Sequence, residues 1–325
     1  MFRSIYSNYL SQYYDLRSSA LRDSARKHEL CYLRRFDAYV AEHLEAFGGI
    51  TPAFINEWIG SLSGKSRTVA GEIIVVRQFL AYLGLSGERV SLPVIPKVRD
   101  DYVPYIFSDG ELNRIFASAD NIVIKDPKAD PYMAIEFPVI LRLLYSCGLR
   151  IGETVRIGMP DVDLDNGILR MINTKGDKHR LVPMSSVMSD ILSRYCMAMG
   201  LYGKDSGWLF PASNSNGHIS DKAVKRRFEM ILAANGIRLE NRNRHERGPC
   251  LHCIRHVFAI RSFLQAEHQG RHLDDTIPFL SMYLGHEGIN ETAKYLKFSC
   301  DLFPESVDAF GDFMSGMIPE VDYEA

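Results

Sequence analysis

The chain has 325 residues, of which 46% are hydrophobic, and a formal net charge of −2. This length and composition predict an ordinary globular protein of two domains, and because no uninterrupted run of about 18 apolar residues occurs, we expect no membrane-spanning helix. The six cysteines are scattered and the N-terminal stretch lacks the apolar core of a signal peptide, so we exclude a disulfide framework and expect a cytoplasmic protein.

The charges are unevenly distributed along the chain. Residues 301–325 carry seven acidic residues and no Lys or Arg, so removing them would change the net charge from −2 to +5. Between Ser220 and Arg255, nine Lys or Arg residues stand against four Asp or Glu. A basic segment of this kind is compatible with nucleic-acid binding, but charge runs are usually solvated surface, so charge alone does not predict DNA as a partner.

Residues 1–90 are predicted to be helical. Apolar residues from Leu33 to Leu44 recur at helical spacing, and Thr51-Pro52 has the form of an N-cap followed by proline in the first turn. Residues 91–106 then hold three prolines, a spacing that no helix or long strand tolerates. We therefore predict a helical domain followed by an interdomain linker.

The region after the linker begins with a helix that Ser108 and Glu111 start as a capping box. A second, apolar helix ends at Gly148, and the chain resumes at Arg150 with Glu153 three residues later. Taken alone, this pattern is typical of a helix-turn-helix corner with a salt-bridged surface arginine. It gains a functional interpretation only from the C-terminal residues discussed below.

From Asp161 the hydrophobic period changes from helix to strand. Turns are predicted at Asn166-Gly167 and around Gly176, with alternating runs between them and on to Pro183, which indicates a small antiparallel sheet. Residues 187–199 are predicted to be helical again, and Ser220 is the expected N-cap of a basic helix.

The strongest chemical signal lies in residues 251–297, where three motifs follow in order. They are His252-x-x-Arg255, the triplet Leu284-Gly285-His286, and Tyr295 nine residues after His286. Residues three apart on a helix share a face, so an imidazole and a permanent guanidinium can bind a phosphate together. A tyrosine at a fixed distance from a further histidine supplies a nucleophile.

This ordered set resembles the catalytic box of the tyrosine recombinases, the phage integrase family, whose pattern is H-x-x-R-H, L-G-H and a tyrosine. The resemblance implies a mainly α fold with a small antiparallel β-sheet, arranged as a two-domain DNA clamp. Its domains would be a helical core-binding domain (1–90), a linker (91–106), an α+β catalytic domain (107–300) and an acidic tail (301–325) that contacts a neighbouring subunit.

The resemblance also implies a role for each catalytic residue. Tyr295 would attack a DNA phosphodiester to form a 3′-phosphotyrosyl intermediate, and His252 would accept its proton. Lys175, or Lys178 in the same turn, would protonate the departing 5′ oxygen. Arg150 and Arg255 would bind the non-bridging oxygens of the phosphate. His286 would hydrogen-bond to the scissile phosphate, and Glu153 would support the site. The implied catalytic set is Arg150, Lys175, His252, Arg255, His286 and Tyr295.

The implied partner is double-stranded DNA carrying a specific site with inverted repeats, bound by a homo-tetramer on two sites in the nucleoid. Residues 236–250 are expected to contact DNA or to form a disordered loop. The run IPFLSMYLGH is similar to that of transposon-encoded members, which favours work on a mobile element by integration, excision or transposition. The expected DNA contacts are Lys65, Arg67, Arg77, Lys222, Lys225, Arg226 and Arg227.

Three alternatives remain open at this point. A type IB topoisomerase uses the same chemistry on the same fold, and a DNA-binding regulator could keep the fold without catalysis. A zinc-dependent hydrolase would use Cys250, Cys253 and nearby histidines, but a second Cys/His pair at metal spacing is missing. We therefore expect no metal and no cofactor.

Overall fold

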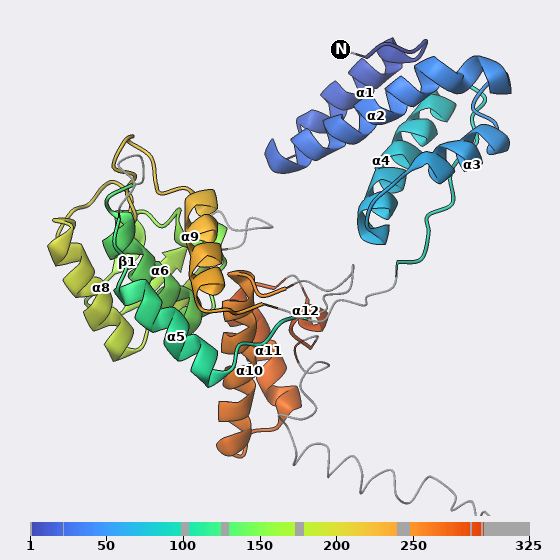
Figure 1. Ribbon diagram of the computed structural model, residues 1–325. Helices are drawn as coiled ribbons and strands as arrows, with labels where there is room; N and C mark the ends of the chain where they lie inside the picture. The colour runs from blue at the N-terminus through green and yellow to red at the C-terminus, as the bar shows by residue number, and fades with distance from the viewer. Residues whose placement is uncertain are drawn as a thin grey trace, which may run out of the picture. The chain divides into compact units, whose positions relative to one another are not determined.

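The computed structural model describes residues 2–21, 23–98, 104–124, 130–172, 179–238, 248–286, 288–293 and 295. The chain forms two compact units, Met1–Asp101 and Tyr102–Ala325 (Figure 1). The division falls inside the proline-rich segment 91–106. Several predicted features lie outside the described residues: linker residues 99–103, Lys175 and Lys178, residues 239–247 of the basic segment, and the tail 301–325.

The N-terminal unit is helical, as predicted. Its helices are α1 (Ser7–Ser18), α2 (Asp23–Phe47), α3 (Pro52–Ser61) and α4 (Ser66–Leu85). The Thr51 side chain accepts a hydrogen bond from the Phe54 amide, which confirms the predicted N-cap of α3. Aromatic rings fill the core between these helices, with Phe36 edge-on to Trp58 at 5.1 Å between ring centroids.

Among the described residues, α4 is the helix whose length and apolar composition would allow it to cross a membrane. Its Phe79, Leu80 and Leu83 side chains are instead fully buried in the core of the N-terminal unit. Core helices of globular proteins share this apolar composition. We therefore describe α4 as the central core helix of this unit.

The second unit is mainly helical with a small sheet. The strands β1 (Val162–Asp163), β2 (Ile168–Met171) and β3 (Arg180–Pro183) pair antiparallel in the order β1-β2-β3, with Leu169 opposite Val182, so the predicted sheet is confirmed. A short 3₁₀ turn, η1 (Met159–Asp161), precedes it. The helices are α5 (Asp109–Asp120), α6 (Met133–Cys147), α7 (Ile151–Thr154), α8 (Ser186–Ala198), α9 (Asp221–Ala234), α10 (His252–His268), α11 (Leu273–Leu284) and α12 (Ile289–Ala293).

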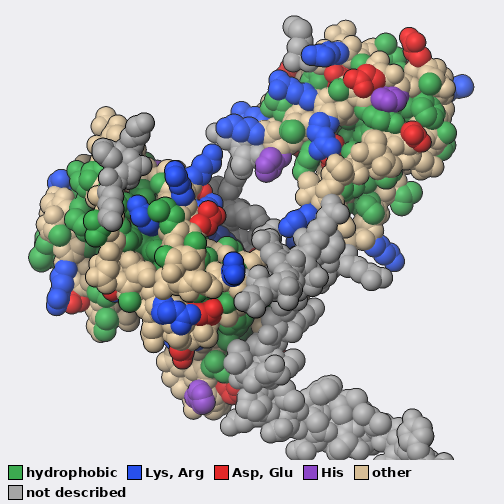
Figure 2. Space-filling model, viewed as in Figure 1, with side chains coloured by type: hydrophobic (Ala, Val, Ile, Leu, Met, Phe, Trp, Pro, Cys, Tyr) green, Lys and Arg blue, Asp and Glu red, His purple; other side chains and the backbone are tan. Residues whose placement is uncertain are grey.

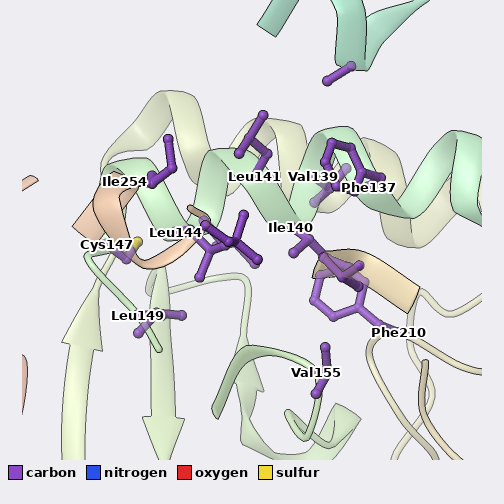
Figure 3. Packing of buried hydrophobic residues seen from close by; sticks show 14 of the residues in the cluster. Phe137, Val139, Ile140, Leu141, Leu144, Cys147, Leu149, Val155, Phe210 and Ile254 are labelled. Carbon is purple, nitrogen blue, oxygen red and sulfur yellow. The ribbon is translucent and has the colours of Figure 1, made fainter. Parts of the chain in front are cut away.

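Helix α6 forms the centre of this unit and packs against α5, α8 and α10. Figure 3 shows its buried side chains, including Phe137 and Ile140, directed towards residues of other segments such as Phe210. The capping box of Ser108 and Glu111 at the start of α5 is present, and the Ser220 side chain accepts from the Lys222 amide at the start of α9. Both predicted helix starts are therefore confirmed.

One buried carboxyl group in α6 gives the fold a pH dependence. Glu136 is 0% exposed, and neither of its carboxyl oxygens has a hydrogen-bond partner among the described residues. Burial raises the pKa of Glu136 from 4.5 to about 8, and the nearby charge of Asp130 adds to the rise. The folded protein therefore favours the protonated, neutral form of the Glu136 carboxyl group.

The folded pKa of Glu136 lies above its unfolded value, so its contribution to stability is complete below pH 4.5 and is lost as the pH rises towards 8. We expect Glu136→Gln to abolish this loss and to raise the free energy of unfolding at pH 8 by several kcal/mol relative to the wild type, at about 1.4 kcal/mol per pKa unit. Denaturant unfolding at pH 4.5 and pH 8 measures it, with exposed Glu229→Gln as the control. Equal pH dependence of both variants would contradict the assignment.

Candidate active site

Arg150 is positioned by the junction between α6 and α7. Helix α6 ends at Gly148, whose φ of +58° is a left-handed conformation that favours glycine, and a Cβ there would also collide with the Phe258 ring. The chain then restarts with Arg150 as the N-cap of α7. The Glu153 carboxylate accepts from the Arg150 backbone amide at 3.3 Å and from Arg150 Nη1 at 2.9 Å. Glu153 therefore fixes both the backbone and the guanidinium of Arg150.

Arg255 lies in the first turn of α10 and is only 1% exposed. Its guanidinium donates to the Gly148 carbonyl and, over 2.7 Å, to the Leu284 carbonyl at the end of α11. The Leu284 carbonyl is also 3.5 Å from Arg150 Nη1, so the two arginines converge on one turn. Burial, together with the charge of Arg150, lowers the pKa of Arg255 to about 10, which still leaves it charged at neutral pH.

His286 follows Gly285, which ends α11 in the left-handed conformation with a φ of +65°. The His286 Nε2 atom lies 3.0 Å from Arg255 Nη2, and Nδ1 lies 2.6 Å from Thr292 Oγ1. Because a guanidinium can only donate, Nε2 accepts, and Nδ1 carries the proton and donates to Thr292. Burial and the Arg255 charge lower the pKa of His286 to about 3, so the ring is neutral.

Tyr295 follows α12 and is 6% exposed. Its ring centroid lies 6.0 Å from that of His286 and 5.2 Å from that of His256, and it interacts electrostatically with the Arg255 guanidinium. The His256 ring also contacts the ring of His252, 4.8 Å away, at the exposed start of α10. A row of rings therefore leads from the solvent-facing histidine to the buried tyrosine.

The structure thus assembles five of the six predicted catalytic residues from separate segments. The guanidinium of Arg255 lies 3.0 Å from His286 and interacts electrostatically with Tyr295, and Arg150 reaches the same turn. His252 is connected to Tyr295 through the ring of His256. Lys175, the sixth, lies outside the described residues.

Sequence reasoning missed two residues of this site. Arg180, at the start of β3, donates from Nη2 to Glu153 at 2.8 Å and from Nε to the Tyr283 carbonyl at 2.9 Å. His256 is not among the predicted catalytic residues. Its pKa is lowered to about 3, first by burial and then by the charges of His252 and Arg255. The second histidine of the H-x-x-R-H pattern was the available signal for His256. For Arg180, the only signal in the sequence was its position just after the predicted turn around Gly176.

The carboxylate of Glu153 lies between two guanidinium groups, those of Arg180 and Arg150. Burial acts to raise the pKa of Glu153, but the hydrogen bonds and charges of Arg180 and Arg150 outweigh it and hold that pKa below its usual value. The carboxylate is therefore ionised at neutral pH, and stability that depends on it is lost as the pH falls through its folded pKa.

The cysteine pair considered for a zinc site lies at the beginning of α10. The Sγ atoms of Cys250 and Cys253 are 3.6 Å apart, and Cys253 is buried. Helix α10, which carries Arg255, begins at His252, so Cys253 lies in its first turn and Cys250 precedes it. Within the described ranges, no group of three or more His, Cys, Asp or Glu side chains is placed to hold a metal ion.

Known proteins resemble this chain in sequence and in fold. A sequence profile of the phage integrase family matches residues 108–299. The putative integrase/recombinase y4rE of Sinorhizobium fredii is 28% identical over 90% of this chain and 92% of its own length. The tyrosine recombinase XerD of Rhizobium meliloti is 28% identical over 65% of this chain and 68% of its own.

Two solved structures show the same fold. XerH site-specific recombinase bound to palindromic difH substrate has a TM-score of 0.66 and 18% identity, over 88% of this chain and 80% of that one. A lambda integrase dimer bound to a core site has a TM-score of 0.65 and 15% identity, over 90% of this chain and 95% of that one. With its profile match and its ordered site, the chain belongs to the phage integrase family of tyrosine recombinases, enzymes that cut and rejoin DNA strands.

Proposed function

We propose that this protein is a site-specific recombinase in which Tyr295 attacks a phosphodiester of double-stranded DNA. A bond forms between the tyrosine oxygen and phosphorus, and the bond between phosphorus and the 5′ oxygen breaks. The observation that carries the proposal is the convergence of Arg255, His286 and Tyr295, because His286 contacts both the Arg255 guanidinium and the Tyr295 ring. The phosphotyrosyl bond keeps the energy of the broken bond, so a 5′ hydroxyl of another strand can reverse the step without metal or nucleotide.

The two arginines are suited to the charge that develops in this reaction. In-line attack adds a negative charge to a phosphodiester that already carries one, and guanidinium groups meet phosphate oxygens with paired charge-assisted hydrogen bonds. His252 is proposed to accept the Tyr295 proton, because it is exposed and lies next to His256, whose ring contacts Tyr295. Lys175 is proposed to protonate the departing 5′ oxygen.

The direct test is covalent trapping of DNA. The wild-type protein, incubated in EDTA with a nicked duplex whose cleaved end diffuses away, should give a protein–DNA band that survives a denaturing gel. EDTA is included because no step of the proposed reaction uses a metal ion. Loss of the band on chelation, with recovery on adding zinc or magnesium, would revive the hydrolase alternative.

In each unit, exposed basic residues are proposed to contact DNA. Lys222, Lys225 and Arg226 of α9 are exposed, whereas Arg227 is half-buried. In Figure 2, Lys and Arg side chains lie near the position that α9 occupies in Figure 1, with acidic side chains among them. In the N-terminal unit Lys65 and Arg67 are exposed, whereas Arg77 is half-buried and donates to the Pro93 carbonyl. Arg77 is therefore the weakest of the proposed DNA contacts.

We expect DNA affinity to fall steeply with salt, because each neutralised phosphate contributes a slope of about 0.9 in log K against log salt. Replacing Lys225, Arg226 and Arg227 together by Gln should reduce this slope by up to the contribution of about three phosphate contacts. The contribution of Arg227 should be the smallest because it is half-buried. Filter binding over a salt series measures the slope. A matched Arg194→Gln variant, exposed on α8, is the control, and an unchanged slope in the α9 variant would show that this helix does not touch the backbone.

The proposed assembly is a homo-tetramer on two DNA sites with inverted repeats, acting in the cytoplasm on the nucleoid. Its proposed task is integration, excision or transposition of a mobile element. The acidic tail 301–325 is poorly suited to lie on DNA, where like charges repel, so we assign it to the neighbouring subunit. The tail assignment is tested by truncating the chain after Ser299. The truncated protein should still bind a single DNA site but should form no synaptic complex on a native gel. If the intact protein instead relaxes supercoiled DNA as a monomer, the type IB topoisomerase alternative is favoured.

A further inference from the structure

Arg180 connects three segments that lie far apart in the sequence. It begins β3, its Nη2 atom donates to Glu153 in α7, and its Nε atom donates to the Tyr283 carbonyl at the end of α11. The side chain is only 8% exposed. The Arg180 guanidinium therefore joins the sheet, the Arg150 junction and the turn before His286.

Space and hydrogen-bond geometry at this point require a guanidinium group. A Cβ on Gly285 would lie 2.8 Å from Arg180 Nη1, so glycine there makes room for the guanidinium as well as allowing the left-handed turn. The two acceptors are reached from different nitrogen atoms of one rigid, planar group. A lysine has a single nitrogen atom and cannot reproduce both hydrogen bonds in this arrangement.

The charge of Arg180 bears on the neighbouring Arg150. The Glu153 carboxylate is shared, with Oε1 bound to Arg150 and Oε2 bound to Arg180. The group of two arginines and one glutamate keeps a net charge of +1. Without Arg180, the full negative charge of Glu153 would face Arg150 and offset its attraction for a phosphate.

We propose that Arg180 is a positioning residue for strand cleavage, a role that rests on the proposed function. It holds Glu153, which holds the guanidinium of Arg150. It also holds the end of α11, where the Leu284 carbonyl receives Arg255. Arg180 thus acts on both phosphate-binding arginines without touching the DNA itself.

The test is Arg180→Lys in the full chain, with Arg180→Gln as a second variant, assayed by single-turnover cleavage of a nicked duplex at saturating protein. We expect a rate roughly tenfold to a hundredfold below wild type, with DNA affinity unchanged. The control is Arg170→Lys on β2, whose side chain is 55% exposed and whose rate should equal wild type. Rates are compared below the unfolding midpoint of every variant, so that lost stability does not imitate lost positioning.

A double-mutant cycle separates positioning through Arg150 from an independent role. If Arg180 acts through Arg150, the Arg180→Lys/Arg150→Lys protein should be little slower than Arg150→Lys alone. The same cycle is run with Arg255→Lys, because Arg180 also holds the end of α11 that receives Arg255. Rate factors that multiply in both cycles, or a wild-type rate in both Arg180 variants, would overturn the inference. A wild-type protein that forms no covalent adduct would instead overturn the proposed function, so the two failures are distinguishable.

Discussion

Tyr295→Phe should bind its DNA site with wild-type affinity and trap no covalent adduct. The phenylalanine ring can keep the contacts of the Tyr295 ring with His256 and His286, because both are contacts between rings. The substitution removes the hydroxyl group and its electrostatic interaction with Arg255. Since that oxygen is the proposed nucleophile, the loss of cleavage should be complete rather than partial.

The matched control for this experiment is Tyr283→Phe. Tyr283 lies in α11 near the same site, and its hydroxyl donates to the Pro183 carbonyl of β3. Its loss should leave adduct formation intact. The two variants are compared on a nicked duplex by denaturing gel, with binding measured by gel shift. An adduct band in the Tyr295→Phe lane would show that another residue is the nucleophile.

The residues that converge at the candidate site were predictable from the sequence because they carry local signals. Gly148 and Gly285 end helices in the left-handed conformation, and the functional arginine and histidine follow each turn directly. The H-x-x-R spacing is a property of one helix. Such patterns depend only on residues close together in the sequence, so they can be recognised without knowing the tertiary structure.

Arg180 could not be predicted because its role depends on contacts between distant segments. Its partners are 27 and 103 positions away, and no local period indicates which of the basic residues around the β2–β3 turn is buried. The tautomer of His286 could not be predicted from the sequence either. Its tautomer follows from the two atoms that its nitrogens face, Arg255 Nη2 and Thr292 Oγ1.

That tautomer has a consequence for the proposed chemistry. With Nε2 accepting from Arg255, His286 has no proton on that nitrogen to give to a phosphate. To donate there, as the family resemblance implies, the ring must gain a proton or exchange tautomers. A phosphate beside it would favour the protonated form, because a nearby negative charge raises the pKa of a histidine. His286 and Arg255 thus form one coupled unit.

Arg255→Lys should lower the rate of cleavage by a hundredfold or more. Removal of one preorganised donor to the transition state costs about 3 kcal/mol, and the planar fork of Arg255 reaches the Leu284 carbonyl and His286 from Nη2 and the Gly148 carbonyl from Nη1. A lysine can satisfy one of these acceptors but not the set. The acceptors left buried without a partner should also reduce stability, by about 1–3 kcal/mol each.

Rate and stability are separated by a matched substitution on the same helix. Arg261 in α10 pairs with Asp109 at the surface and should tolerate lysine with no change in cleavage. Both variants are melted by circular dichroism, and single-turnover rates are then measured at a temperature where each is folded. DNA affinity should change little in either, because most of the binding energy comes from contacts outside the scissile phosphate. An Arg255→Lys protein that cleaves within about tenfold of wild type would contradict the proposal that this guanidinium stabilises the transition state.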